Sequence, residues 1–287
     1  MKNIKKIFIT LITLVLFVYS SISFIIYTEF TNQYLAVHFL DIGQGDGILI
    51  RTPDKRTIIV DGGPDNSLVY KLGEFLPFYE RDIDLLILTH PDADHLISFV
   101  ELLKRYRVHH ALITGIADDR PTYQAFLELL AAQRTAVLIA GSVTRIPVGS
   151  EVMIEILYPF ASLFNQVPED SNDSSIIFSL HYGEHRFLFT GDASVAVEHA
   201  LLQAGVVVHA DVLKVGHHGS DTSTSQEFLE AVAPSIAVIQ VGKDNKFGHP
   251  HRRVLDRLDA HSVATFINSL TGDITIQSDG HILRVIP

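Results

Sequence analysis

Short apolar runs and helix-like periodicity alternate along residues 34–287, and glycine, proline and aspartate mark most of the breaks between them. Compact apolar runs predict strands, and apolar residues at spacings of three and four predict helices. The predicted strands are 34–41, 47–52, 57–60, 83–89, 110–114, 136–139, 152–157, 175–182, 186–190, 211–215, 235–240, 264–268, 273–277 and 282–285. The predicted helices are 67–75, 94–106, 122–133, 194–204, 225–232 and 251–260.

The order of these elements predicts the fold class. Three strands separated by turn residues come first, alternating strands and helices follow, and the same order then repeats. This order is typical of an α/β protein in which two sheets pack face to face between layers of helices. Because no shift in composition divides residues 34–287, we expect a single domain there.

The amino terminus has a different pattern. Lys2, Lys5 and Lys6 precede an uncharged, mostly apolar run over residues 7–27. As a helix this run would be roughly 30 Å long, which matches the hydrocarbon core of a bilayer. Residues 1–30 are therefore predicted to be a transmembrane signal anchor that crosses the cell membrane once and leaves the domain outside the cytoplasm. The alternative is a signal peptide cleaved near Ser20–Ser23, which would release a secreted domain.

The ionisable composition limits the chemistry. The formal net charge of −11 argues against broad nonspecific binding to nucleic acid, although metal ions can supply positive charge locally. The chain has no cysteine, which excludes disulfides, thiolate metal sites and cysteine nucleophiles. Because cysteine is absent, any metal must be held by nitrogen and oxygen ligands, and the fifteen histidines are candidates for the nitrogen ligands. Histidines without neighbouring ligands, such as His109 and His261, are expected at the surface.

The strongest chemical signal is His-Pro-Asp-Ala-Asp-His at residues 90–95, directly after the predicted strand 83–89. Imidazole and carboxylate side chains hold divalent metals in hydrolases. His90, Asp92 and Asp94 alternate along the backbone, and His95 follows at once. We therefore expect these four side chains to face two neighbouring metal positions.

Three further strands end in turns that carry potential ligands. Asp192 follows the strand 186–190, His217 and His218 follow the strand 211–215, and His249 lies in the loop after the strand 235–240. Sites in α/β proteins collect at the carboxyl ends of strands, so we expect these segments to converge with residues 90–95. A lone carboxylate such as Asp192 is suited to bridging two metals.

Together these residues resemble the metallo-β-lactamase superfamily, and more specifically the hydrolase domain of ComEC-type DNA-uptake proteins, over roughly residues 35–286. The resemblance rests on the motifs at 39–46 (FLDIGQGD), 61–63 (DGG), 89–95 (THPDADH), 190–192 (TGD), 214–220 (KVGHHGS) and 248–251 (GHPH). It implies an αββα sandwich over residues 34–287 with a metal site at the edge of the two sheets.

The resemblance also implies residue roles. His90, Asp94 and His95 fall on the superfamily's metal-binding motif, Asp192 on its bridging aspartate, and His217 or His218 on its last ligand. The early aspartate of the family, Asp61, supports the site without binding metal, and Asp41 and Asp46 of the opening motif are also assigned as supporting residues.

Two departures from the superfamily pattern change the expected metal. Asp92 replaces the usual histidine, and residues 171–175 (SNDSS) replace a histidine expected before the Thr-Gly-Asp strand. Oxygen ligands shift the preference from Zn²⁺ toward Mn²⁺ or Mg²⁺, so β-lactam hydrolysis is not expected. ComEC-type domains share both departures. In those proteins the domain is fused to a membrane channel, so this chain is not expected to translocate DNA alone.

The functional hypothesis is a phosphodiesterase or nuclease that uses two divalent ions, Mn²⁺ or Zn²⁺ with Mg²⁺ as a third option, on DNA outside the cytoplasmic membrane. Asp94, Asn172 and His249 are the candidate catalytic residues, and Ser220 and Lys243 are candidates for holding phosphate oxygens. The alternatives are an extracellular phosphodiesterase on a cell-envelope polymer, such as one bearing phosphorylcholine, and a non-catalytic module that binds DNA or a partner. The sequence leaves the oligomeric state open.

Overall fold

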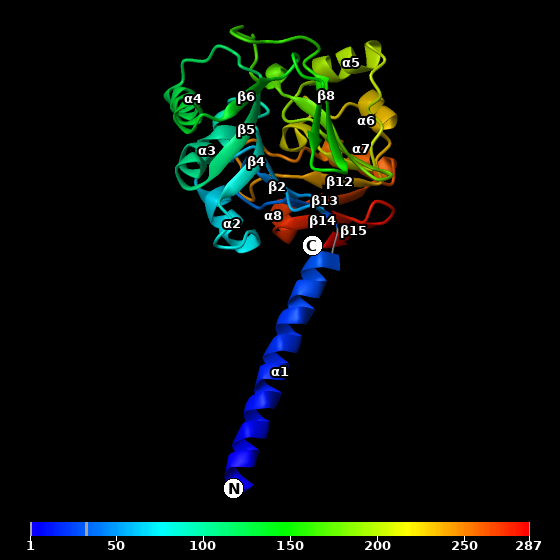
Figure 1. The fold of residues 1–287 in the computed structure, drawn as a ribbon. Helices are drawn as coiled ribbons and strands as arrows, with labels where there is room; N and C mark the ends of the chain where they lie inside the picture. Colours follow the sequence, from blue (N-terminus) through cyan, green and yellow to red (C-terminus); the bar gives the residue numbers. More distant parts are fainter. Residues whose placement is uncertain (1, 32–33, 287) are drawn as a thin grey trace.

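The computed structural model describes residues 2–31 and 34–286. Two mixed sheets pack face to face between two layers of helices (Figure 1). The first sheet has eight strands in the order β15-β14-β1-β2-β3-β4-β5-β6, antiparallel from β15 to β3 and parallel from β3 to β6. Its strands are β1 (Leu35–Phe39), β2 (Ile48–Arg51), β3 (Thr57–Val60), β4 (Asp82–Ile87), β5 (Arg107–Ile113), β6 (Ala136–Ile139), β14 (Ile274–Ser278) and β15 (Leu283–Ile286).

The second sheet repeats this plan with seven strands in the order β13-β12-β11-β10-β9-β8-β7. It is antiparallel from β7 to β10 and parallel from β10 to β13. Its strands are β7 (Arg145–Val148), β8 (Val152–Tyr158), β9 (Ile177–Tyr182), β10 (His185–Phe189), β11 (Val212–Lys214), β12 (Ile236–Ile239) and β13 (Ala264–Ile267).

Helices connect the parallel strands and cover the outer faces of both sheets. The first sheet carries α2 (Ser67–Phe75), α3 (Ala93–Arg105) and α4 (Pro121–Gln133), and the second carries α5 (Val195–Gln203), α6 (Gln226–Val232) and α7 (Arg252–Ala260). Figure 1 shows these two sets of helices on opposite sides of the paired sheets. Short turns of helix are η1 (Asn172–Ser174), η2 (Gly216–Gly219) and α8 (Asn268–Thr271).

Three apolar cores hold these layers together. The central core joins the two sheets, and within it Phe39 of β1 stacks on Phe189 of β10 with ring centroids 6.2 Å apart. A second core lies between the first sheet and α2–α4, and a third lies between the second sheet and α5–α7. Because strand side chains alternate between faces, each sheet supplies one set of side chains to the central core and the other to its helices. The predicted sandwich of two sheets between helices is confirmed.

Strand β7 and the short helical elements η1, η2 and α8 are absent from the sequence prediction. Strand β7 lies at the edge of the second sheet, is partly exposed and contains Pro147, so it lacks a strong apolar pattern. The four residues of α8 are too few to show helical periodicity.

The amino-terminal segment forms α1 (Lys2–Thr31), which extends away from the sandwich as a single rod (Figure 1). Thr10 and Ser20 donate their hydroxyls to helix carbonyls at 3.0 and 2.9 Å. Across the residues that the structure describes, we find no helix with both the length and the apolar character needed to span a bilayer. The transmembrane helix predicted for residues 1–30 is therefore not supported.

Candidate metal centre

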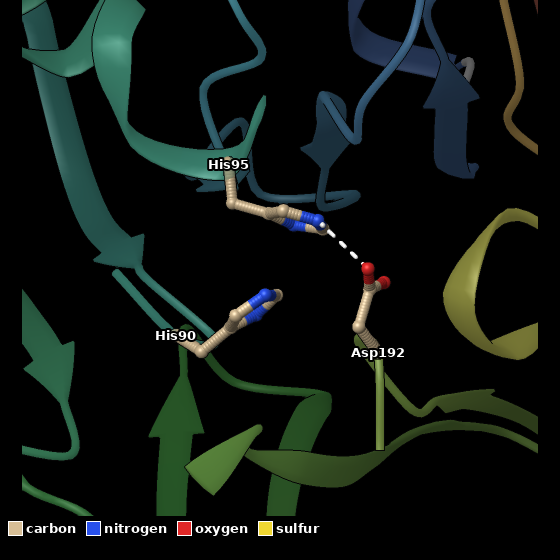
Figure 2. A group of neighbouring side chains, drawn as sticks. All are labelled: His90, His95 and Asp192. Carbon is tan, nitrogen blue, oxygen red and sulfur yellow. Dashed lines mark ion pairs between the residues drawn. The ribbon is translucent and has the colours of Figure 1, made fainter. Parts of the chain in front are cut away.

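The segments expected to converge do meet at one edge of the sandwich. Residues 90–95 follow β4, Asp192 follows β10, and His218 lies in η2 directly after β11. Figure 2 shows His95 reaching toward Asp192 while the ring of His90 lies beside them. His95 Nε2 lies 3.3 Å from Asp192 Oδ2, and the rings of His90 and His95 are 4.2 Å apart. The site therefore joins residues from both sheets, because parallel strands end together at this edge.

Several of these side chains are close enough to share an ion. Ligand atoms within 4.8 Å of one another form four groups among the described residues: His90, His95 and Asp192; Asp94, His95 and His218; Asp46, Asp61 and His95; and Asp46, Asp192 and His218. His218 rather than His217 belongs to these groups. His217 Nε2 lies 3.8 Å from Asp192 Oδ2, at the side of the cluster.

The histidines are oriented as metal-binding histidines are. Asp61 accepts a hydrogen bond from His95 Nδ1 at 2.9 Å, and the carbonyl of Gln240 accepts one from His218 Nδ1 at 2.9 Å. The Nε2 atoms of His90, His95 and His218 are buried and form no hydrogen bond in the described part of the chain, although Asp192 Oδ2 lies 3.3 Å from that of His95 and 3.4 Å from that of His218. A buried nitrogen without a partner is costly unless a ligand satisfies it. These residues therefore fit one or two divalent ions.

The loop of residues 43–47, called here the glycine loop, brings Asp46 into contact with this cluster. Gly45 has a φ of +137° and packs on the backbone of Asp94 so closely that a Cβ would collide with the carbonyl oxygen of Asp94. The next residue, Asp46, donates its backbone N–H to that same oxygen at 3.2 Å. Only glycine allows this approach, which explains its place in the opening motif.

Asp46 forms an ion pair with Lys214, and both side chains are almost completely buried. Lys214 Nζ also lies 3.8 Å from Asp192 Oδ1. Burial opposes the charged form of Lys214, but the Asp46 and Asp192 carboxylates outweigh it and raise the pKa of the amine. Lys214 therefore supplies a fixed positive charge beneath the cluster.

Strained backbone turns the two adjacent histidines. His217 and His218 have φ values of +47° and +54°, in the left-handed region that costs non-glycine residues of order 1–3 kcal/mol each. His217 donates its N–H to the Gly191 carbonyl at 3.1 Å, and Ser220 donates its N–H to the His217 carbonyl at 2.8 Å. These hydrogen bonds hold the turn that sends His218 inward and His217 toward the rim.

The histidines at the centre of the cluster are held in the charged form by carboxylates. Burial works against charge on His95 and His218, but Asp192, with Asp61 beside His95 and Asp46 beside His218, raises both pKa values well above their ordinary value. Burial likewise works against charge on Asp192, but His218 and His95 lower its pKa well below the usual range. The pKa of His90 falls to about 4 because of burial and the neighbouring His95 charge.

These pKa shifts predict how the free energy of unfolding of the metal-free protein depends on pH. Protonated His95 and His218 contribute stability that is fully present below about pH 6.5 and is lost as the pH rises through their raised folded pKa values. Asp192 contributes stability that is present above about pH 3.9 and is lost on acidification. Urea unfolding of metal-free protein should therefore show falling stability from pH 7 to 9. His218→Gln should reduce this loss of stability between pH 7 and 9, whereas the control His109→Gln, at an exposed histidine, should not. A free energy of unfolding that rises up to pH 9 would contradict the prediction.

Hydrogen bonds to one carboxylate oxygen hold Asp92 in place. Asp92 Oδ1 accepts hydrogen bonds from Arg120 Nη1 at 2.9 Å and from Ser171 Oγ at 2.7 Å. Its other oxygen, Oδ2, lies 3.8 Å from His90 Nε2. Asp92 thus belongs to none of the four close groups, but one oxygen faces His90. A cavity of about 940 Å³ lined by Arg120, Ser171 and Phe164 opens next to it.

The remaining predicted site residues lie farther out. The ring of His249 is 5.6 Å from the ring of His217, and Ser220 supports the His217 turn. Asn172 begins η1, next to Ser171, and its backbone N–H bonds Asp170 at 2.9 Å. Lys243 is exposed. Asp41 lies away from the cluster, because its backbone N–H donates to Asp273 at 2.7 Å and Lys71 pairs with the same carboxylate.

The comparison with known families agrees with this geometry. The sequence model of the family described as the metallo-beta-lactamase superfamily matches residues 40–243, which include the glycine loop and the residues of all four close groups. The chain belongs to the metallo-β-lactamase superfamily. The predicted resemblance is thus confirmed, and the chain is a metal-dependent hydrolase of that superfamily.

Among the curated relatives is competence protein ComA of Neisseria gonorrhoeae, which is 29% identical over 238 residues, covering 83% of this chain and 31% of that protein. The chain is 31% identical over 257 residues to ComE operon protein 3 of Bacillus subtilis strain 168, covering 83% of this chain and 32% of that protein. It is 28% identical over 255 residues to Recombination protein 2 of Haemophilus influenzae, covering 88% of this chain and 30% of that protein. The chain therefore spans about a third of the length of these relatives.

A solved structure shares the superfamily fold. CmlA, a diiron β-hydroxylase from Streptomyces venezuelae, superposes with a TM-score of 0.55 at 16% identity, covering 89% of this chain and 54% of that one. At this identity the likeness concerns the sandwich and not the reaction.

Local sequence patterns do not identify the residues that neutralise and orient the candidate ligands. Lys214 lies in the motif at 214–220 but has no predicted role, although a lysine between an apolar strand and a glycine turn is an unusual pattern. Arg120 and Ser171 carried no local signal, because each contacts Asp92 from a different part of the chain. Glu198 was also missed. It is buried in α5 and accepts the N–H groups of Thr224 and Ser225, which anchors the end of the loop that carries His218.

Proposed function

We propose that this protein is a phosphodiesterase that uses divalent metal ions to cleave DNA. The observation that carries the proposal is the buried set of three histidine Nε2 atoms without hydrogen-bond partners, next to the Asp192 carboxylate. Divalent ions bound there would lower the pKa of water and neutralise charge on a phosphodiester. Carboxylates and imidazoles without thiolates suit Mn²⁺ or Zn²⁺, with Mg²⁺ also compatible. The name of the Haemophilus influenzae relative, a recombination protein, supports DNA as the substrate.

The chain's own residues divide the remaining work. His90, His95, His218 and Asp192 are the proposed ligands, and Asp94, whose side chain is 32% exposed while that of His218 is 1% exposed, lies where the cluster opens to solvent. Asp94 Oδ2 is 3.4 Å from His218 Nε2, so Asp94 can bind metal and accept a proton from an attacking water. Asp92, with one oxygen facing His90, is proposed as a weaker ligand.

His249 lies beside His217, with ring centroids 5.6 Å apart. Burial, together with the charges of His217 and His218, lowers the pKa of His249 to about 4. At neutral pH its ring is therefore uncharged, which favours hydrogen bonding to a phosphate oxygen over protonating the leaving group. We propose that Asn172, Ser220 and Lys243 hydrogen-bond phosphate oxygens of the substrate at the edge of the site.

The direct test is digestion of single-stranded and duplex DNA by the full chain with added Mn²⁺. Asp94→Ala and Asp192→Ala should both remove the activity, whereas Asp259→Ala, an exposed aspartate at the end of α7, should retain it. Activity that survives both substitutions in the cluster would overturn the metal assignment.

A second candidate substrate is a cell-envelope phosphodiester that carries a cationic group, such as phosphorylcholine. The observation in its favour is the cavity beside Asp92, which Asp118, Asp119 and the exposed Phe164 also line. Carboxylates and an aromatic face attract quaternary ammonium groups. Comparing turnover of DNA with turnover of a phosphorylcholine ester separates the two candidates.

We also propose that α1 attaches the domain to a membrane outside the cytoplasm. Large apolar side chains between Leu11 and Tyr19 are 45–70% exposed, and exposed apolar surfaces of this kind mark contact with lipid or protein. Flotation of the full chain with lipid vesicles tests this, and Val15→Asp combined with Leu16→Glu should abolish flotation. Unchanged flotation of that variant would contradict it.

Arg120 should tune metal affinity through Asp92. Because it fixes one Asp92 oxygen, Arg120→Met should weaken Mn²⁺ binding by about 10- to 100-fold, the range for groups that orient metal ligands. The matched control is Arg145→Met, which removes an exposed arginine paired with Glu155 on the edge strand β7. Titration calorimetry with Mn²⁺ measures both. Equal affinities for the two variants would show that Asp92 plays no part in binding.

A further inference from the structure

Residues 243–253, from the loop after β12 into the first turn of α7, form a positively charged rim beside the candidate metal centre. The segment carries four cationic side chains and one carboxylate, although the whole chain has a net charge of −11. We call this segment the basic strip. Its charged residues are Lys243, Asp244, Lys246, Arg252 and Arg253, and all five are exposed.

The charges of the basic strip are mostly not neutralised by neighbours. Arg252 lies 3.4 Å from Asp256 on the same helix. Lys243, Lys246 and Arg253 form no ion pair with any residue that the structure describes. Charges left unpaired on an acidic protein attract an anion that approaches this rim.

An aromatic ring stands in the middle of the basic strip. Phe247 is 62% exposed. Asn245 fixes the loop, since its Oδ1 accepts the N–H groups of Phe247 and His249 at 3.2 and 3.0 Å and its Nδ2 donates to the His249 carbonyl at 2.7 Å. The ring of Phe247 is thus presented to solvent by a preformed loop.

A series of rings connects Phe247 to the metal cluster. Phe247 stacks on His249 with centroids 5.7 Å apart and planes inclined by 24°. The ring of His249 lies 5.6 Å from that of His217, whose Nε2 is 3.8 Å from Asp192 Oδ2. A strand with one base stacked on the outer face of Phe247 could therefore follow this series of rings, so that a phosphate a few nucleotides along reaches the cluster.

We propose that the basic strip, including Phe247, binds single-stranded nucleic acid and leads its backbone to the candidate metal centre. This inference rests on the proposed phosphodiesterase function and names the form of its substrate. Lysine and arginine side chains neutralise phosphates, and an exposed aromatic ring stacks on an unpaired base of any sequence. Bases inside a duplex are covered by their neighbours, so the ring favours a single strand.

The test is binding of fluorescent oligo(dT) to the full chain in EDTA, where cleavage is suppressed, with a duplex of the same length as comparison. Phe247→Ala should raise the Kd for oligo(dT) by about tenfold. Lys243→Gln combined with Lys246→Gln should weaken binding and reduce the salt slope by about 0.7 for each lysine. Matched controls are Phe78→Ala, a phenylalanine 85% exposed before β4, and the pair Lys104→Gln with Arg105→Gln at the far end of α3.

The outcomes separate this inference from the proposed function. Oligo(dT) affinity that falls in the basic-strip variants but not in the controls supports the inference, even if the wild type cleaves no phosphodiester. Equal affinity in Phe247→Ala and Phe78→Ala, or binding of duplex as tight as that of oligo(dT), overturns it. Hydrolysis of bis-p-nitrophenyl phosphate should stay within about twofold of wild type in Phe78→Ala and reports on the chemistry alone.

Discussion

Asp192→Asn is expected to lower kcat/KM for Mn²⁺-dependent DNA hydrolysis by about a thousandfold, or about 4 kcal/mol of transition-state stabilisation. Asp192 Oδ2 is the central oxygen of the cluster, at 3.3 Å from His95, 3.4 Å from His218 and 3.8 Å from His217. Asparagine keeps the shape of the side chain but removes its charge, so the loss reports on electrostatics rather than packing. Steady-state rates on an oligonucleotide over a range of Mn²⁺ concentrations measure the effect.

Two controls keep this result interpretable. Asp259→Asn makes the same chemical change at an exposed position and should leave kcat/KM unchanged. Thermal melts with and without Mn²⁺ show whether Asp192→Asn is folded, and the metal should raise the melting temperature of wild type much more than that of the variant. A folded Asp192→Asn protein with wild-type turnover would exclude Asp192 from the reaction.

Lys214→Met is expected to lower the free energy of unfolding by about 3–5 kcal/mol, the range for removing one partner of a buried ion pair. Lys214 is 1% exposed and its amine neutralises Asp46, with Asp192 also nearby. Without the lysine, Asp46 is left as a buried carboxylate whose pKa is no longer held down by that charge. Urea denaturation of metal-free protein at pH 7 measures the change.

The matched experiment restores the charge balance. Combining Asp46→Asn with Lys214→Met removes both members of the pair and should recover a substantial part of the lost stability. Lys71→Met removes a more exposed lysine that pairs with Asp273 and should cost only about 1 kcal/mol or less. If the double variant is no more stable than Lys214→Met alone, the ion pair with Asp46 is not the source of the effect.

The sandwich could be predicted because most of its strands and helices have strong patterns. Helix α2 begins and ends at the predicted residues, Ser67 and Phe75, and the other predicted helices agree to within a residue at each end. Strand β7 could not be found in this way, because an exposed edge strand with a proline has neither an apolar run nor a clean alternation. The order of the strands across each sheet depends on contacts between distant residues and is not encoded in local periodicity.

The site was predictable where its residues follow strands. Residues 90–95, Asp192 and His218 all lie at carboxyl ends of strands, and parallel strands bring those ends together. Which of His217 and His218 faces inward depends on two left-handed residues, and the sequence does not show that conformation. Asp41 and Asp46 lie in one motif, but only Asp46 contacts the cluster, whereas the backbone N–H of Asp41 donates to Asp273, which pairs with Lys71.

Asp92 shows how a substitution within a family motif can be compensated by distant residues. Its carboxylate replaces the imidazole usual in the superfamily, and Arg120 and Ser171 hold one of its oxygens. That arrangement leaves an oxygen facing His90, which agrees with a site richer in oxygen ligands. Arg120 and Ser171 also line the neighbouring cavity.

The central claim is that the cluster around Asp192 holds the metal ions on which hydrolysis depends. The most direct measurement is elemental analysis of the full chain after equilibration with Mn²⁺ or Zn²⁺ and removal of free metal, compared with Asp192→Asn. We expect about two divalent ions per wild-type chain and a loss of at least one in the variant. Wild-type protein with little bound metal, or the same metal content in both proteins, would contradict it.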